Sequence, residues 1–281
     1  MQDNCKLCGF FKDLRLSHIM PDFYIRSSEA WLKTGAQQQT QPHSFVVGVS
    51  SDFKDGWKQR NNWEKQLGWT EYLLCHECEQ RFGVHEATAR VFLYGNAPAP
   101  LKKQLLGTIV QASQPGSPPD FLEIREVTID YRALKLFQLS LLWRAGVAKG
   151  MFFKNVDLGK KHEKRLRQLL VNDDPGLELD YPCIMFDLRS QKIEFEGFWR
   201  EPTTCHDEDQ GQRLYKIVIG GYAFMYSVSS HSPSQSFNLF CAKPSGKMFL
   251  YVVNGELFLK KMQDALDKAG KLNLQTFAAS R

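Results

Sequence analysis

Two cysteine pairs constrain this chain more than any other feature of its sequence. Cys5 and Cys8 lie in "CKLCGF", and Cys75 and Cys78 lie in "LLCHECE", each pair with two residues between its members. This spacing lets one tight turn aim both thiolates at the same point, as tetrahedral zinc sites require. Gly9, directly after Cys8, suits such a turn. The sequence therefore predicts a structural zinc ion that closes the segment 9–74 into a loop, with unrelated free thiols as the alternative.

The overall composition is that of an ordinary globular protein. The chain has 281 residues, of which 43% are hydrophobic and 24% charged. Its first residues show no charged start followed by an apolar core and a cleavage site, so we expect a cytoplasmic protein, where cysteines rarely form disulfides. The most apolar helical stretch contains Arg144 and Lys149. Charged residues are costly in lipid, so we expect no membrane span.

A third motif lies between the cysteine pairs. His18 stands in "LSHIMPDF", and Glu79 directly follows Cys78. In this order, the motifs of residues 1–90 resemble those of the HNH (ββα-metal) nucleases that carry a treble-clef zinc site. In that family an Asp-His pair followed by Ile-x-Pro ends the first strand, and Leu-Cys-x-x-Cys precedes an Asn or His on a helix. Taken alone, a histidine in this place is more often a hydrogen-bonded core residue than a catalyst.

The resemblance implies a metal-dependent endonuclease that hydrolyses DNA, with RNA as the less favoured substrate, and a role in defence against phage or plasmids. It gives His18 the position of the general base that activates water. It gives Glu79 the position of a helix ligand for Mg²⁺ or Mn²⁺. Ser17 departs from the family, because it stands where the metal-binding Asp is expected. A hydroxyl is a poor ligand for Mg²⁺, whereas the carboxylate of Glu79 is a good one.

Two further residues of the same predicted helix are candidates for the site. Glu86 follows Glu79 by seven residues, which is two helical turns, and His85 lies close to that face. Either side chain is suited to holding a metal or a phosphate. The alternative makes Glu79 a carboxylate that stabilises the positive end of the helix dipole and Glu86 an exposed polar residue. A rival function is a non-catalytic zinc-binding module for nucleic acid or a protein partner, which the missing Asp at position 17 favours.

The pattern along the chain predicts an α+β protein with three regions. Residues 1–98 form the zinc-stapled, HNH-like module with an insertion at 34–70. Residues 99–175 are mainly helical, with a strand at 121–130 and helices at 132–150 and from Asp157 to before Pro175. Residues 176–281 show the period of two typical of antiparallel strands, including "FNLFCA" at 237–242, and end in an amphipathic helix. This last region suggests a protein partner or activator and carries no chemical motif.

A concentration of positive charge lies in the second predicted helix of the central region. Between 144 and 167 basic residues greatly outnumber acidic ones. Positions 160, 164 and 167 share one helical face at spacings i, i+4 and i+7, which suits contact with a phosphate backbone. A solvated helix surface is the alternative. The predicted nucleic-acid-binding residues are Lys160, Lys161, Lys164, Arg165 and Arg167.

Overall fold

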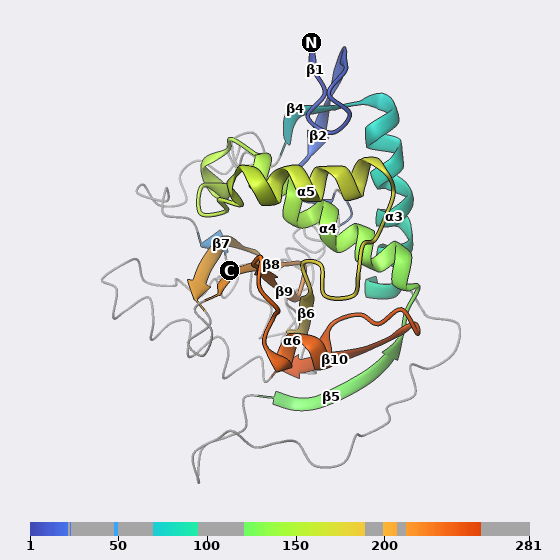
Figure 1. Cartoon of the computed structure of the whole chain (residues 1–281), viewed down its shortest axis with the longest axis vertical. Coiled ribbons are helices and arrows are strands. Elements are labelled where there is room, and N and C mark those ends of the chain that lie inside the picture. The colour runs from blue at the N-terminus through green and yellow to red at the C-terminus, as the bar shows by residue number, and fades with distance from the viewer. Residues whose placement is uncertain are drawn as a thin grey trace, which may run out of the picture.

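A computed structural model gives the fold, and it describes residues 1–21, 23, 48–49, 70–94, 121–188, 199–206 and 212–253. The predicted carboxy-terminal helix and most of the predicted insertion at 34–70 lie outside the described residues. The described part is a mixed α/β structure with two sheets and several helices (Figure 1).

The smaller sheet forms the amino-terminal module. It consists of β1 (Gln2–Asn4), β2 (Phe11–His18) and β4 (Thr70–Cys75), which pair antiparallel in the order β1-β2-β4. β4 continues directly into α3 (His76–Tyr94). The register shifts between Arg15 and Leu16, where Leu73 is the extra residue on β4, and Leu14 and Ser17 of β2, three positions apart, are both buried. Ser17, a polar residue at the end of β2, therefore faces the interior.

The larger sheet has the strand order β3-β7-β8-β9-β6-β10-β5 in the described residues. Most neighbours are antiparallel, as predicted, but β10 runs parallel to β6 and β3 parallel to β7. The prediction of an antiparallel region at 176–281 is therefore wrong at the pairing of β6 with β10, whereas β3 lies outside that region. The strands are β3 (Gly48–Val49), β5 (Phe121–Thr128), β6 (Cys183–Asp187), β7 (Trp199–His206), β8 (Arg213–Ile219), β9 (Tyr222–Val228) and β10 (Lys247–Val253).

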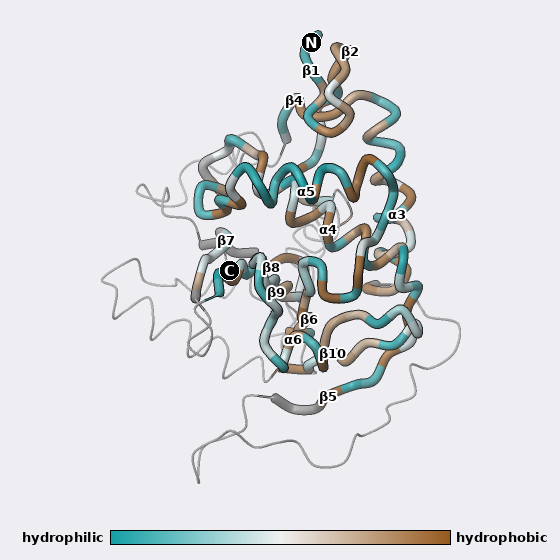
Figure 2. The backbone as a smooth tube through the Cα atoms, viewed as in Figure 1, coloured by the Kyte–Doolittle hydropathy of each residue, from teal (hydrophilic) through white to brown (hydrophobic). Residues whose placement is uncertain are grey.

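Two predicted central helices are present. α4 (Tyr131–Val147) begins at Asp130, whose carboxylate accepts a hydrogen bond from the backbone N–H of Ala133 at 3.0 Å. After a 3₁₀ turn (Met151–Phe153), α5 (Gly159–Val171) follows; the Asp157 carboxylate accepts from the N–H of Gly159 at 3.0 Å. Every residue of α4 from 133 to 145 is buried, whereas α5 is largely hydrophilic along its visible side (Figure 2).

One predicted strand is a helix. The segment "FNLFCA" lies mostly in α6 (Gln235–Phe240), so the strand prediction there is wrong. Phe237 and Cys241 are buried while Leu239 is 50% exposed. A strand places residues 237, 239 and 241 on one face, whereas a helix brings residues 237, 240 and 241 together. The exposed Leu239 shows that the apolar residues follow the helical period.

A single hydrophobic core connects the amino-terminal module to the larger sheet. α4 packs against both α3 and α5, and its Phe137 ring lies 6.3 Å from that of Phe224 on β9. The core cluster runs without a break from Cys5 and Phe82 through α4 to Leu250. α4 is thus the element through which the cysteine-bearing module is attached. Among the described residues, none of the helices combines the length and the apolar character that a membrane span requires.

Candidate functional site

The four cysteines of the two pairs meet at one point. Cys5 and Cys8 flank the turn before β2, Cys75 ends β4, and Cys78 lies in the first turn of α3. Their sulfur atoms all lie within 4.8 Å of one another, and Sγ of Cys8 is 3.9 Å from Sγ of Cys75. Tetrahedral zinc with bonds of about 2.3 Å places its sulfurs about 3.8 Å apart. The cluster is therefore a candidate metal centre whose donors and spacing fit zinc.

The backbone around Cys5 adopts the tight turn that the sequence predicts. Gly9 has φ +84° and its N–H donates to the carbonyl of Cys5 at 2.8 Å. The N–H of Cys75 donates to Sγ of Cys5 at 3.3 Å. A hydrogen bond with Cys78 lowers the pKa of the Cys5 thiol to about 4, while that contact and burial raise the pKa of Cys78. Crowded thiols of this kind lose their remaining protons together only when a cation offsets the charge.

The side chain of Arg167 attaches α5 to this turn. Its Nε donates to the carbonyls of Lys6 at 3.0 Å and Leu7 at 2.6 Å. A Cβ atom at Gly9 would lie 2.8 Å from Nη2 of Arg167, so glycine also serves the close approach of α5. The structure therefore uses this predicted nucleic-acid-binding residue to hold the cysteine turn against α5.

Ser17 and Glu79, the two positions where the sequence departs from the HNH pattern, are in contact. Ser17 is fully buried, and its Oγ donates to Oε2 of Glu79 at 2.5 Å. The same Oγ accepts from the N–H of Leu74 at 3.2 Å. Oε1 of Glu79 has no partner in the described part of the chain, and the side chain is half-buried. The end of β2 and the first turn of α3 are thus joined by a hydroxyl and a carboxylate next to the cysteine cluster.

His18 lies one residue further along β2 and is half-buried. Neighbouring side chains of a strand point to opposite faces, and Ser17 is the one directed at Glu79. The main-chain carbonyl of His18 accepts from Nη1 of Arg144 at 2.8 Å. Its position is therefore set through the backbone, by a residue of α4.

Arg144 is a residue of this site that the sequence analysis missed. It is only 2% exposed, and its Nη2 lies 2.7 Å from Oε1 of Glu86. Its guanidinium also lies over the ring of Phe82, 5.4 Å from the centroid. Arg144 thereby joins β2, α3 and α4. The signal was present, because an arginine inside an apolar helix needs a buried partner, but the sequence does not show which carboxylate supplies it.

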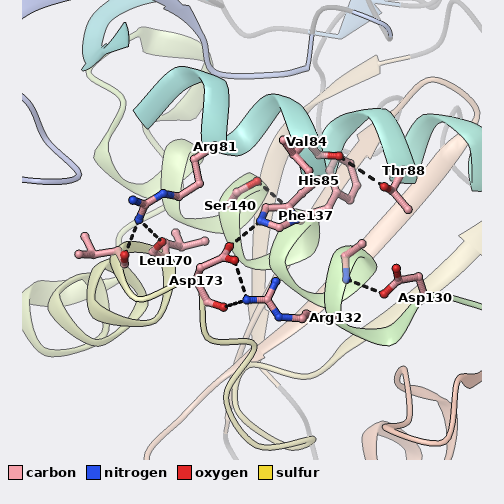
Figure 3. A network of polar contacts seen from close by, with 12 residues as sticks. Arg81, Val84, His85, Thr88, Asp130, Arg132, Phe137, Ser140, Leu170 and Asp173 are labelled. Atoms are coloured by element: carbon pink, nitrogen blue, oxygen red, sulfur yellow. Dashed lines mark hydrogen bonds and ion pairs between the residues drawn. The ribbon is translucent and has the colours of Figure 1, made fainter. Parts of the chain in front are cut away.

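His85 and Glu86 are engaged away from the contact between Ser17 and Glu79. His85 is 6% exposed, and its Nε2 lies 2.7 Å from Oδ1 of Asp173 (Figure 3). The other carboxylate oxygen of Asp173, Oδ2, lies 2.6 Å from Nη2 of Arg132. Burial acts to raise the pKa of Asp173, but hydrogen bonds from Arg132 and His85 outweigh it and lower that pKa. His85 lies six positions beyond Glu79, about 9 Å along the helix axis. These contacts hold His85 and Glu86 in the packing between α3 and its neighbours.

The predicted basic row is divided by its contacts. Arg165 pairs with Asp180 at 2.5 Å, and Nζ of Lys161 donates to Ser230 at 2.9 Å. Lys160 and Lys164 are exposed, and neither has a hydrogen-bond or ion-pair partner within the described ranges. These two lysines are the members of the row that remain available to an external phosphate.

The ion pair of Arg144 and Glu86 predicts a large effect on stability. Replacing Glu86 with Ala leaves a buried guanidinium without its carboxylate, so we expect a loss of about 3 kcal/mol in the free energy of unfolding. Urea-induced unfolding of the wild type and the variant measures this difference in the free energy of unfolding. Glu77→Ala is the matched control, because Glu77 lies on the same helix and its side chain is 65% exposed beside Lys12. Unfolding of Glu86→Ala at the wild-type urea concentration would contradict this structural role.

In comparisons with known proteins, no family model, curated protein or solved structure matches the chain.

Proposed function

We propose that residues 1–21 and 70–94 form a treble-clef zinc module that works as a divergent HNH-like endonuclease on DNA, with RNA as the alternative. The contact between Ser17 and Glu79 beside the four cysteines carries this proposal. It joins the strand end and the helix start, which are the two positions that hold the divalent ion in the family the motifs resemble. Strands β2 and β4 are antiparallel neighbours, and β4 runs directly into helix α3, as in a ββα unit; β3 lies between these strands in the chain and pairs with β7 of the larger sheet.

In this proposal zinc has a structural role and a second, harder cation binds at Glu79. Oε1 of Glu79 offers one carboxylate oxygen, and Mg²⁺ commonly uses one or two carboxylates together with substrate oxygens and water. A bound Mg²⁺ or Mn²⁺ would stabilise charge on the scissile phosphate and the leaving oxygen. Ser17 fixes the Glu79 carboxylate by donating to Oε2.

The resemblance alone gives His18 the role of general base, because the alternation along β2 turns its side chain to the face opposite Ser17. In the proposed reaction its imidazole would accept a proton from the attacking water, while Arg144 holds the carbonyl of the same residue and fixes the end of β2. Lys160 and Lys164 supply exposed positive charge for the phosphate backbone. His85 and Glu86 have no part in this chemistry, because Asp173 and Arg144 hold them in the packing of α3.

The alternative function is a non-catalytic zinc module that binds nucleic acid or a protein. Ser17 favours it, because a serine hydroxyl replaces the charge of the expected Asp and already bonds to Leu74 and Glu79. Incubation of zinc-loaded protein with supercoiled plasmid and with structured RNA, with Mg²⁺, with Mn²⁺ or with neither, separates the two functions. Metal-dependent cutting supports the nuclease; binding without cutting under every condition supports the alternative.

Glu79→Gln is expected to weaken the second metal site while leaving the zinc site intact. Glutamine keeps an oxygen near Ser17 but removes the charge, so cleavage in Mg²⁺ should fall and should recover in part at raised Mn²⁺. The measurement is the cleavage rate as a function of each metal concentration, together with the zinc content. Glu77→Gln, in the same helical turn, serves as the control and should show the wild-type metal dependence. An identical metal response of both variants would exclude Glu79 as a ligand.

A further inference from the structure

The turn that carries Cys5 and Cys8 ends in two exposed aromatic side chains. Phe10 is 67% exposed and Phe11 is 66% exposed. They directly follow Gly9, whose positive φ turns the chain out of the cysteine cluster. Neighbouring apolar rings left in solvent are typical of surfaces that contact a ligand or partner. We name this pair, Phe10 and Phe11, the aromatic tip.

The hydrophilic face of α5 adjoins the aromatic tip. Arg167 of α5 donates hydrogen bonds to the carbonyls of Lys6 and Leu7, and its guanidinium fills the space beside Gly9. The residue that directly precedes Phe10 is therefore in contact with α5. Lys164 and Lys160 precede Arg167 by three and seven residues and share its helical face. A row of positive charge, made by Lys160 and Lys164 and continued by exposed Lys6, therefore leads to the tip.

We propose that the aromatic tip and this lysine row bind one unpaired strand of nucleic acid, with bases stacked on the two rings and phosphates along the lysines. The inference rests on the proposed function in one respect, namely that the ligand is a nucleic acid. Stacking on exposed rings needs bases that are free of a duplex stack, and a positive row beside the rings follows the backbone of such a strand. The substrate class is accordingly single-stranded or locally unpaired nucleic acid.

Fluorescence anisotropy with a labelled oligothymidine strand, without added divalent metal, tests the proposal. Phe10→Ala with Phe11→Ala should weaken binding about tenfold, with zinc content and melting unchanged because both rings are exposed. Lys160→Gln with Lys164→Gln should lower the slope of log affinity against log salt by about 1.4, since each phosphate contact on a single strand contributes about 0.7. Val84→Ala with Val91→Ala, an exposed apolar pair on α3, is the control and should bind as wild type.

Two results would overturn the inference. One is equal wild-type affinity for the strand and for a duplex of the same length; the other is undiminished strand binding by the double phenylalanine variant. In the second case, a changed oligomeric state in sedimentation would assign the tip to a second copy of the chain. If the wild type binds or cuts nucleic acid while the phenylalanine variant behaves normally, the inference alone fails. If the wild type binds no nucleic acid at all, the proposed function fails with it.

Discussion

Replacing Cys75 with serine is expected to release the zinc ion and unfold the amino-terminal module. Cys75 connects β4 to α3 and contributes one of four sulfurs that lie within 4.8 Å of one another. Structural zinc in small modules contributes about 10–16 kcal/mol of apparent binding free energy, which becomes folding free energy where no site exists in the unfolded chain. The expected results are loss of stoichiometric zinc in metal analysis and a lower, broader melting transition.

Cys205→Ser is the matched control for this experiment. Cys205 is an exposed thiol on β7, outside the four-cysteine cluster, so its variant should retain both zinc and the wild-type melting curve. Hydrogen exchange would then locate the damage, because loss of zinc should expose amides of β2, β4 and the start of α3 before those of β8 and β9. Wild-type protein purified without zinc, or an unchanged melting curve for Cys75→Ser, would refute the structural zinc site.

Local patterns in the sequence predicted the clustering of the four cysteines and most of the regular elements. Two residues between cysteines force both thiols toward one point, and this constraint holds whatever the rest of the fold does. The helix at α4 and the strands at β5, β6, β8, β9 and β10 also follow from short-range periodicity. At α6, the apolar residues of the sequence are compatible with both the strand period and the helix period. Only the exposure of Leu239 in the structure decides for the helix.

Contacts between distant segments lay beyond this kind of prediction. The parallel pairing of β6 and β10 depends on the path of the chain, which the alternation of side chains does not record. Arg144 forms an ion pair with Glu86 on another helix, and Arg167 donates a hydrogen bond to the backbone of the cysteine turn. Arg167 was predicted to bind phosphate and Arg144 was given no partner, because burial and pairing are properties of the folded chain. The contact between Ser17 and Glu79 could be expected only through the resemblance.

Removal of the imidazole of His18 is expected to lower the cleavage rate by about 10²- to 10⁴-fold, the usual contribution of a general base. The bond from Arg144 goes to the main-chain carbonyl, which alanine retains, so the end of β2 should keep its place in His18→Ala, and the melting curve of the variant checks its folding. Binding of the uncut substrate should also remain close to wild type, because the phosphate contacts are assigned to α5. The expected change is therefore in the cleavage rate of the protein–substrate complex, not in substrate binding.

Single-turnover cleavage at saturating protein measures this rate separately from binding. His76→Ala is the matched control, since His76 is an exposed histidine at the start of α3 beside the same cysteine cluster. It should cut at the wild-type rate, which excludes a general effect of losing a histidine near zinc. If the wild type cuts and His18→Ala cuts equally fast with unchanged pH dependence, His18 is a structural residue at the end of β2. The search for a base would then move to another side chain close to Glu79.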